Sequence, residues 1–158
     1  MPGNSQKRSE ENAQQAKIAA HYEIPVITNL GTEEYSVIID ALFGTGLKRE
    51  VTGHYREVLC SVNQMAGKKV AVDLPSGIHD TTGARMGIAF CADLTVAIAF
   101  PKRGLFLQEG NVCAGKILTG DIGIFLGKHS QKEQLHLAMK KQDLISGISK
   151  KRKKKIQQ

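Results

Sequence analysis

The 158-residue chain lacks any apolar run long enough to cross a bilayer. Its longest runs, such as residues 41–43 and 94–101, fall far short of the roughly 20 residues that a membrane-spanning helix needs. Residues 1–6 contain no apolar core of a secretion signal, so we expect a cytoplasmic location. The 41% of hydrophobic residues can nevertheless bury a core, and the length fits one domain of ordinary size.

Cysteine is scarce and shows neither a metal-binding nor a disulfide pattern. The three residues, Cys60, Cys91 and Cys113, are odd in number and lie 31 and 22 positions apart. No Cys-x-x-Cys pair or Cys/His cluster is present, so neither a disulfide framework nor a structural zinc site is indicated. We expect buried free thiols, because free cysteine is among the most buried residue types.

The net charge of +7 belongs to one end of the chain. Residues 128–158 hold ten Lys or Arg and two acidic residues (+8), which leaves 12 basic and 13 acidic residues (−1) for positions 1–127. The six consecutive basic residues at 150–155 are of the kind that contacts nucleic acid or an anionic surface. No aromatic residue is interleaved among them, and no recognition-helix pattern precedes them, so nucleic-acid binding is disfavoured. A solvated basic linker is the favoured interpretation.

Short runs rich in β-branched residues predict a set of strands. Residues 35–42, 69–73 and 93–100 are nearly continuous apolar runs, which is typical of strands buried on both faces. We also expect a short strand at 24–27, and a further one within 116–123 after a glycine-rich segment.

Helical patterns separate some of these strands. A helix is predicted up to His21, with Ser9 as its cap and a small apolar face, and another from about 53 to 65. A weak helix is suggested at 133–144. Strands that alternate with helical linkers predict an α/β fold with a parallel sheet and helices on its faces.

Two carboxylates end neighbouring strands of this predicted sheet. Asp40 closes one buried run and Asp73 closes the next. In open α/β sheets, ligands bind beyond the carboxyl ends of the strands. We therefore expect both carboxylates at the same edge of the sheet, where a functional site is expected.

A glycine-containing loop follows Asp40. Gly44 and Gly46 would let the backbone approach a ligand closely, and exposed N–H groups in such a loop suit phosphate oxygens. The dinucleotide fingerprint would need a third glycine where Arg49 stands, and the phosphate-loop motif is absent. A plain strand-to-helix turn is the alternative.

The segment that begins at Asp73 reads Asp-Leu-Pro-Ser-Gly. Pro75 and Gly77 predict a tight turn that presents Asp73 and the Ser76 hydroxyl outward. A carboxylate there can act as acid or base, or bind a ribose hydroxyl or a hard cation; the alternative is an Asp that caps the next turn. A hydrolytic triad has no support, because the Gly-x-Ser-x-Gly motif is missing and no histidine is obviously paired with Ser76.

Four segments together resemble a known family. Residues 39–47 (IDALFGTGL), 71–77 (AVDLPSG), 92–96 (ADLTV) and 100–105 (FPKRGL) are similar in order and spacing to the NAD(P)H-hydrate epimerase family, the YjeF amino-terminal domain. The resemblance covers roughly residues 10–126. It implies a Rossmann-like three-layer sandwich with a mainly parallel sheet that lacks the family's first strands. Residues 1–127 would form this partial domain, and residues 128–158 a basic linker.

The resemblance also implies a reaction and a set of site residues. Members of the family interconvert the R and S epimers of hydrated NADH and NADPH. By this resemblance Asp73 would contact the hydrated nicotinamide nucleotide and serve as the acid–base group, while Asp40 and Ser76 would help hold a potassium ion. The substrate-binding loop would comprise Gly44, Thr45, Gly46, Leu47, Lys48, Arg49 and Glu50. The implied partners are an NAD(P)H-hydrate dehydratase domain or protein and a second copy of the chain.

One departure from the family's pattern leaves an alternative open. Family members carry an upstream Asn-Asn-Gly-Gly-Asp-Gly loop, which supplies phosphate contacts and another potassium ligand, and this chain has no such segment. The alternative is therefore a catalytically incomplete fragment or a nucleotide-binding module. Residues 128–158 would then be the remnant of a junction to a dehydratase domain.

Overall fold

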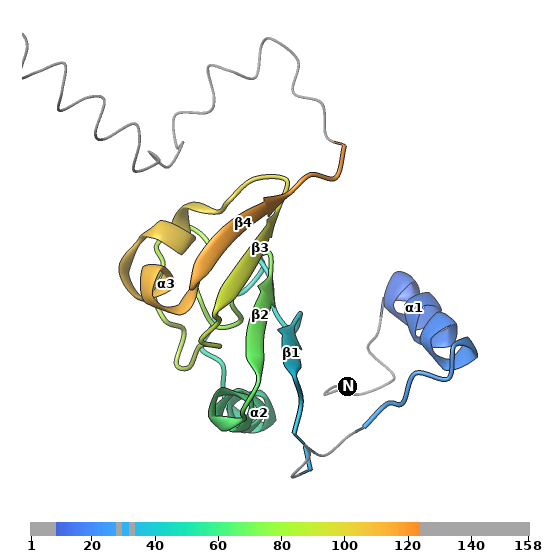
Figure 1. Cartoon of the computed structure of the whole chain (residues 1–158). Coiled ribbons are helices and arrows are strands. Elements are labelled where there is room, and N and C mark those ends of the chain that lie inside the picture. The colour runs from blue at the N-terminus through green and yellow to red at the C-terminus, as the bar shows by residue number, and fades with distance from the viewer. Residues whose placement is uncertain (1–8, 28–29, 32–33, 124–158) are drawn as a thin grey trace, which may run out of the picture.

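A computed structural model describes residues 9–27, 30–31 and 34–123 of the chain. Its strands form one sheet in the order β1-β2-β3-β4, and every neighbouring pair is parallel (Figure 1). The predicted α/β architecture with a parallel sheet is thereby confirmed. The elements in chain order are α1 (Glu10–His21), β1 (Val37–Asp40), α2 (Gly53–Gln64), β2 (Lys68–Val72), β3 (Leu94–Ile98), the 3-10 turn η2 (Arg103–Phe106), α3 (Gln108–Cys113) and β4 (Lys116–Gly120).

One face of the sheet carries the core. The register places Ala71 between Asp40 and Thr95, so these side chains share a face of the pleated sheet. Over β1 and β2, Leu59 of α2 packs in one buried cluster with Ala71. Over β3 and β4, the end of α3 packs in a second cluster at Ala97. The helices that follow β1 and β3 therefore cover the same face in two adjoining halves.

The opposite face remains open within the described ranges. Val37 and Ile39 of β1 are 50% and 66% exposed, and Leu118 of β4 is 45% exposed. The prediction that residues 35–42 are buried on both faces is therefore wrong, because α2 and its loops cover only the face that carries Ile38 and Asp40. The described residues supply no helix on this second face.

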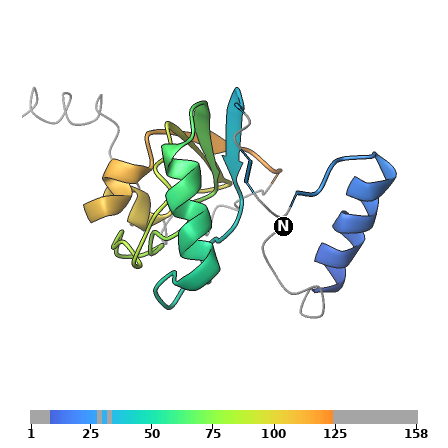
Figure 2. The ribbon, with the colours of Figure 1, turned by 90° about the horizontal axis from the view of Figure 1, so that it is seen from below.

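The helices α1 and α2 lie where the sequence patterns predicted helices, up to His21 and from about residue 53 to 65. Ser9 caps α1 by accepting a hydrogen bond from the Asn12 N–H at 3.3 Å, as predicted. None of the α1 residues is buried, and α1 lies apart from the sheet in both views (Figures 1 and 2).

No helix within the described ranges combines the length and apolar character that a bilayer crossing requires.

Other expectations from the sequence are corrected or fall outside the described part. Residues 24–27 form no strand: their side chains at 24, 26 and 27 are 49–58% exposed, and Pro25 has no N–H to donate to a neighbouring strand. The short helix α3 inside the glycine-rich segment was not expected. The weak helix suggested at 133–144 and the basic linker lie outside the described residues.

The connection between β2 and β3 contains no helix. Residues 73–93 instead form an irregular segment closed by an antiparallel bridge between Ile78 and Arg85. Its Leu74, Ile78 and Phe90 are almost completely buried. This segment therefore acts as part of the core, and it positions the polar residues at the carboxyl edge of the sheet.

Candidate functional site

Asp40 and Asp73 lie at the carboxyl ends of neighbouring parallel strands. Asp40 is the last residue of β1 and pairs in register with Ala71 of β2, and Asp73 directly follows β2. Both carboxylates therefore stand at the same edge of the sheet, as predicted from the sequence. This is the edge at which parallel sheets bind their ligands.

Asp40 and Ser76 form a closely bonded pair. The Ser76 hydroxyl donates to Asp40 Oδ1 at 2.6 Å, and the Ser76 N–H donates to Asp40 Oδ2 at 2.7 Å. The hydroxyl also accepts from the Phe43 N–H at 2.8 Å. Ser76 is only 1% exposed. The prediction that its hydroxyl points outward is therefore wrong, because the turn directs it inward onto a carboxylate 36 positions earlier in the chain.

The Asp40 carboxylate is buried without a cationic partner. It is 6% exposed, and none of the ion pairs formed by the described residues includes it. Burial raises the pKa of this carboxyl, and the hydrogen bonds from Ser76 and Leu42 lower it in part. The pair thus offers a carboxylate oxygen and a hydroxyl oxygen to a cation. A monovalent cation would offset the negative charge of the carboxylate.

This donor set is compatible with potassium. Carboxylate and hydroxyl oxygens are hard donors of the kind that alkali and alkaline-earth cations prefer. Among the described residues, no group of three or more His, Cys, Asp and Glu side chains could hold a metal ion. The oxygens of Asp40 and Ser76 are donors of the type that suits the potassium ion implied by the sequence resemblance.

Asp73 stands in a strained turn of the backbone. Its φ of 69° lies in the left-handed region, and the Leu74 N–H donates to the Val72 carbonyl across it at 2.8 Å. Ala99 repeats this arrangement after β3, with φ of 59° and a hydrogen bond from the next N–H at 2.6 Å. Such γ-turns with a positive central φ are rare and strained, and strained residues of this kind cluster at functional sites.

Two donors hold one oxygen of the Asp73 carboxylate. The Ile98 N–H donates to Oδ1 at 2.9 Å, and the Lys102 ammonium group donates to the same atom at 2.5 Å. The second oxygen, Oδ2, makes no hydrogen bond to any described residue. Both side chains are partly exposed, at 25% for Lys102 and 19% for Asp73. One oxygen is therefore fixed by the protein, and the other is available to a ligand.

Lys102 was missed as a site residue from the sequence alone. It lies in the FPKRGL segment, four positions after the end of β3, which is the strand next to β2 in the sheet. Its location beyond the carboxyl end of a neighbouring strand was the signal that would have found it, because parallel strands converge at that edge. The structure adds it to the site through its ion pair with Asp73.

The glycine-containing loop connects β1 to α2. Phe43 and Leu47 anchor it in the core, whereas Lys48 and Arg49 are exposed. A side chain at Gly44 or Gly46 would meet open space, so a ligand has room beside the backbone here. At the start of α2, Thr52 makes no capping hydrogen bond through its side chain, and the first turn has no acidic residue. The positive end of the helix dipole is thus not neutralised by a carboxylate of that turn.

Comparison with known proteins shows the family. The model of the family described as "YjeF-related protein N-terminus" matches residues 2–104. An NAD(P)H-hydrate epimerase of Levilactobacillus brevis is 42% identical over 124 residues, which are 78% of this chain and 58% of that protein. One of Limosilactobacillus fermentum is 43% identical over 120 residues, 75% of this chain and 58% of that protein. The aligned part of the chain thus spans little more than half the length of these curated relatives.

A solved structure supports the same fold. The crystal structure of yeast ynu0 superposes with a TM-score of 0.63 at 19% identity, and the match covers 87% of this chain and 60% of that one. At that identity the likeness concerns the fold alone. The family match extends over most of the described sheet and includes Asp40, Asp73, Ser76 and Lys102. On this evidence the chain belongs to the YjeF-related N-terminal family.

Proposed function

We propose that this chain epimerises hydrated NADH and NADPH, with Asp73 as the acid–base group at the hydroxyl-bearing carbon of the nicotinamide ring. Relatives that are 36–43% identical carry the name NAD(P)H-hydrate epimerase, which supports this reaction for the family. The observation that carries the proposal for this chain is the state of the Asp73 carboxylate. One oxygen is held by Ile98 and Lys102, and the other faces no described partner.

This arrangement suits proton transfer at a fixed position. Inversion of a hydroxyl-bearing carbon requires one of its bonds to break and to form again on the other face, and a proton must move on and off the departing group. Because Lys102 and the Ile98 N–H fix Oδ1, the orientation of Oδ2 is set before the ligand arrives. Such preorganisation is what makes a positioned acid–base group effective.

The loop at 44–50 would bind the phosphates of the nucleotide. It leads from the carboxyl end of β1 into the uncapped start of α2, where N–H groups and the helix dipole favour an anion. Exposed Lys48 and Arg49 add positive charge at the same place. The role of the residues Gly44, Thr45, Gly46, Leu47, Lys48, Arg49 and Glu50 is part of this proposal.

Asp40 and Ser76 would help hold a potassium ion. The ion, when bound, would offset the negative charge of the buried carboxylate and of nearby phosphates. The buried Asp40 carboxylate, which has no ion-pair partner among the described residues, supports this assignment. Ser76 orients that carboxylate through its two hydrogen bonds.

Turnover of one epimer by matched variants tests the proposal. Starting from material enriched in one epimer, the wild-type chain should restore the mixture, and Asp73→Asn should lower the rate by about 100- to 10,000-fold, the usual range for acid–base groups. Asp80→Asn is the control, since Asp80 is a partly exposed carboxylate on the same β2–β3 connection and pairs with His79. Nucleotide binding without turnover by the folded wild-type chain would instead indicate a binding module.

A further inference from the structure

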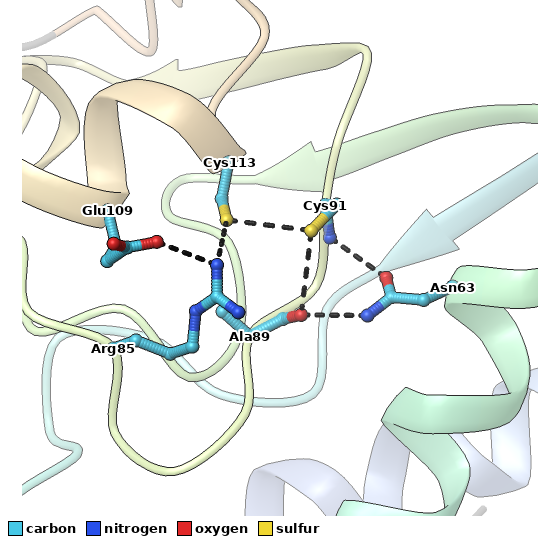
Figure 3. A network of polar contacts seen from close by, with 6 residues as sticks. All are labelled: Asn63, Arg85, Ala89, Cys91, Glu109 and Cys113. Atoms are coloured by element: carbon cyan, nitrogen blue, oxygen red, sulfur yellow. Dashed lines mark hydrogen bonds and ion pairs between the residues drawn. The ribbon is translucent and has the colours of Figure 1, made fainter.

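Two cysteines meet at the edge of the sheet opposite the candidate site. Cys91 lies three positions before β3, and Cys113 ends α3, three positions before β4. Their sulfur atoms are 3.5 Å apart (Figure 3). All three cysteines of the chain are free, and the expectation that they are buried is wrong for Cys91, which is exposed, and for Cys60, which is partly exposed.

We propose that Cys91 and Cys113 are a redox-active pair that forms a disulfide when the chain meets a peroxide. The sulfur atoms need to approach by only about 1.5 Å from 3.5 Å to reach the bonded distance of about 2.05 Å. The two segments that carry the cysteines are already held together by a backbone hydrogen bond, in which the Ala92 N–H donates to the Cys113 carbonyl at 2.9 Å. Closure of the bond therefore requires only a short approach of two sulfur atoms whose neighbouring backbones are already hydrogen-bonded.

The surroundings keep both sulfur atoms in place. Asn63 of α2 receives a hydrogen bond from the Cys91 N–H at 2.9 Å and donates to the Ala89 carbonyl at 2.8 Å, so it holds the loop that carries Cys91. The Arg85 guanidinium lies 3.8 Å from the Cys113 sulfur and pairs with Glu109 at 2.7 Å. Figure 3 shows Arg85 between Glu109 and the Cys113 sulfur, and Asn63 against the backbone of Ala89 and Cys91.

The two thiols differ in access, and this difference orders the reaction. Exposed Cys91 is the sulfur that an oxidant in solution reaches first, whereas Cys113 is buried. Burial, together with the hydrogen bond to Cys91, raises the pKa of the Cys113 thiol to about 11, so this residue suits the second step rather than the first. The neighbouring Arg85 stabilises negative charge as Cys113 loses its proton.

The chemistry balances with hydrogen peroxide as the oxidant. The Cys91 thiolate attacks one peroxide oxygen; an S–O bond forms, the O–O bond breaks, and hydroxide leaves, which yields a sulfenic acid. The Cys113 sulfur then gives up its proton and attacks Cys91; the S–S bond forms, the S–O bond breaks, and a second hydroxide leaves. The two hydroxides take up the two protons that the thiols release, so the thiols together lose two electrons and the peroxide becomes two molecules of water.

Peptide mapping of the oxidised wild-type chain tests the proposal directly. Trypsin separates the three cysteines into peptides 57–68, 86–102 and 104–116. After peroxide treatment and alkylation, we expect 86–102 linked to 104–116 within one chain, lighter by two hydrogens, with Cys60 still alkylated. A cross-link between two chains, a link that involves Cys60, or Cys91 found only as a sulfinic acid would overturn the proposal.

Thermal unfolding supplies a second readout that does not depend on catalysis. A disulfide that closes a ring of about 22 residues should raise the Tm of the oxidised chain by on the order of 10 °C. Cys60→Ser should keep this peroxide-dependent rise, and Cys91→Ser should lose it. Because Cys91 is exposed, its serine variant is expected to fold even where Cys113→Ser does not. An equal rise in Cys91→Ser would refute the assignment.

Discussion

Replacement of Ser76 by alanine should destabilise the fold through the buried Asp40 carboxylate. The Ser76 hydroxyl donates to Asp40 Oδ1 at 2.6 Å and accepts from the Phe43 N–H at 2.8 Å. Ser76→Ala removes both contacts at a position that is 1% exposed, where water cannot readily replace the lost partner. The Ser76 N–H retains its bond to Asp40 Oδ2, so the variant isolates the contribution of the hydroxyl.

The magnitude follows from the two lost hydrogen bonds. A hydrogen bond to a charged group contributes about 1.5–3 kcal/mol, and a buried N–H left unsatisfied costs about 1–3 kcal/mol. Since the two contacts share one oxygen atom, they do not add in full. We expect the free energy of unfolding to fall by about 3–4 kcal/mol at pH 7, which is a large share of the stability of a domain of this size.

The loss should depend on pH in a definite direction. Burial raises the folded-state pKa of Asp40 above its unfolded value of about 3.9. The stability that goes with its protonated form is fully present below that value and is lost as pH rises through the folded pKa. Ser76→Ala removes a bond that favours the ionised form, so it raises this pKa further. The variant should therefore lose about 3–4 kcal/mol at pH 7 and less at pH 4, because protonation of the carboxyl weakens the lost bond.

Urea unfolding of both chains at the two pH values measures these differences. Ser61→Ala is the matched control, because Ser61 is exposed on α2 and its loss should change the free energy of unfolding by no more than about 0.5 kcal/mol. A loss below about 1 kcal/mol for Ser76→Ala at pH 7, or an equal loss at both pH values, would show that the hydroxyl does not support a buried carboxylate.

Three further predictions concern the backbone, the ion pair and the cation. Gly77→Ala should cost about 2–4 kcal/mol in urea unfolding, because Gly77 has φ of 88° and a Cβ there overlaps a backbone carbonyl, whereas Gly44→Ala should be nearly neutral. Lys102→Met should lower kcat at least about tenfold, because the Asp73 carboxylate loses the ammonium group that holds it. Lys102→Arg should restore part of this activity. An unchanged kcat in Lys102→Met would show that Lys102 does not belong to the site. Potassium at about ten times its dissociation constant should raise the free energy of unfolding of the wild-type chain by about 1.4 kcal/mol relative to tetramethylammonium, which appears as a higher Tm. The Tm of Asp40→Asn should be the same in both salts.

Patterns local in the sequence predicted the framework of the fold. The β-branched runs located β1, β2 and β3, and Ser9 marked the start of α1. Because consecutive parallel strands end at one edge, the sequence also predicted that Asp40 and Asp73 lie at the same edge of the sheet, and the register confirms this. These features depend on residue type and period, which one chain displays directly.

Features that depend on contacts between residues far apart in the sequence could not be predicted from the sequence. The inward direction of the Ser76 hydroxyl depends on Asp40, which lies on another strand. Position 110 in α3 requires glycine, because a larger side chain there would collide with the backbone carbonyl of Gly104. This close approach of α3 to η2 is not visible in any local sequence pattern. Exposure of Cys91 likewise depends on how the irregular β2–β3 connection folds.

The rate at which this chain restores the mixture of R and S hydrated NADPH from one epimer tests the central claim most directly. The assay would follow both epimers by NMR in potassium buffer, beside a sample without protein and one with Asp73→Asn. The proposed site predicts a rate for the wild-type chain well above the uncatalysed one and its loss in the variant. A folded wild-type chain that leaves the uncatalysed rate unchanged, or a variant as active as the wild type, would contradict the assignment of Asp73.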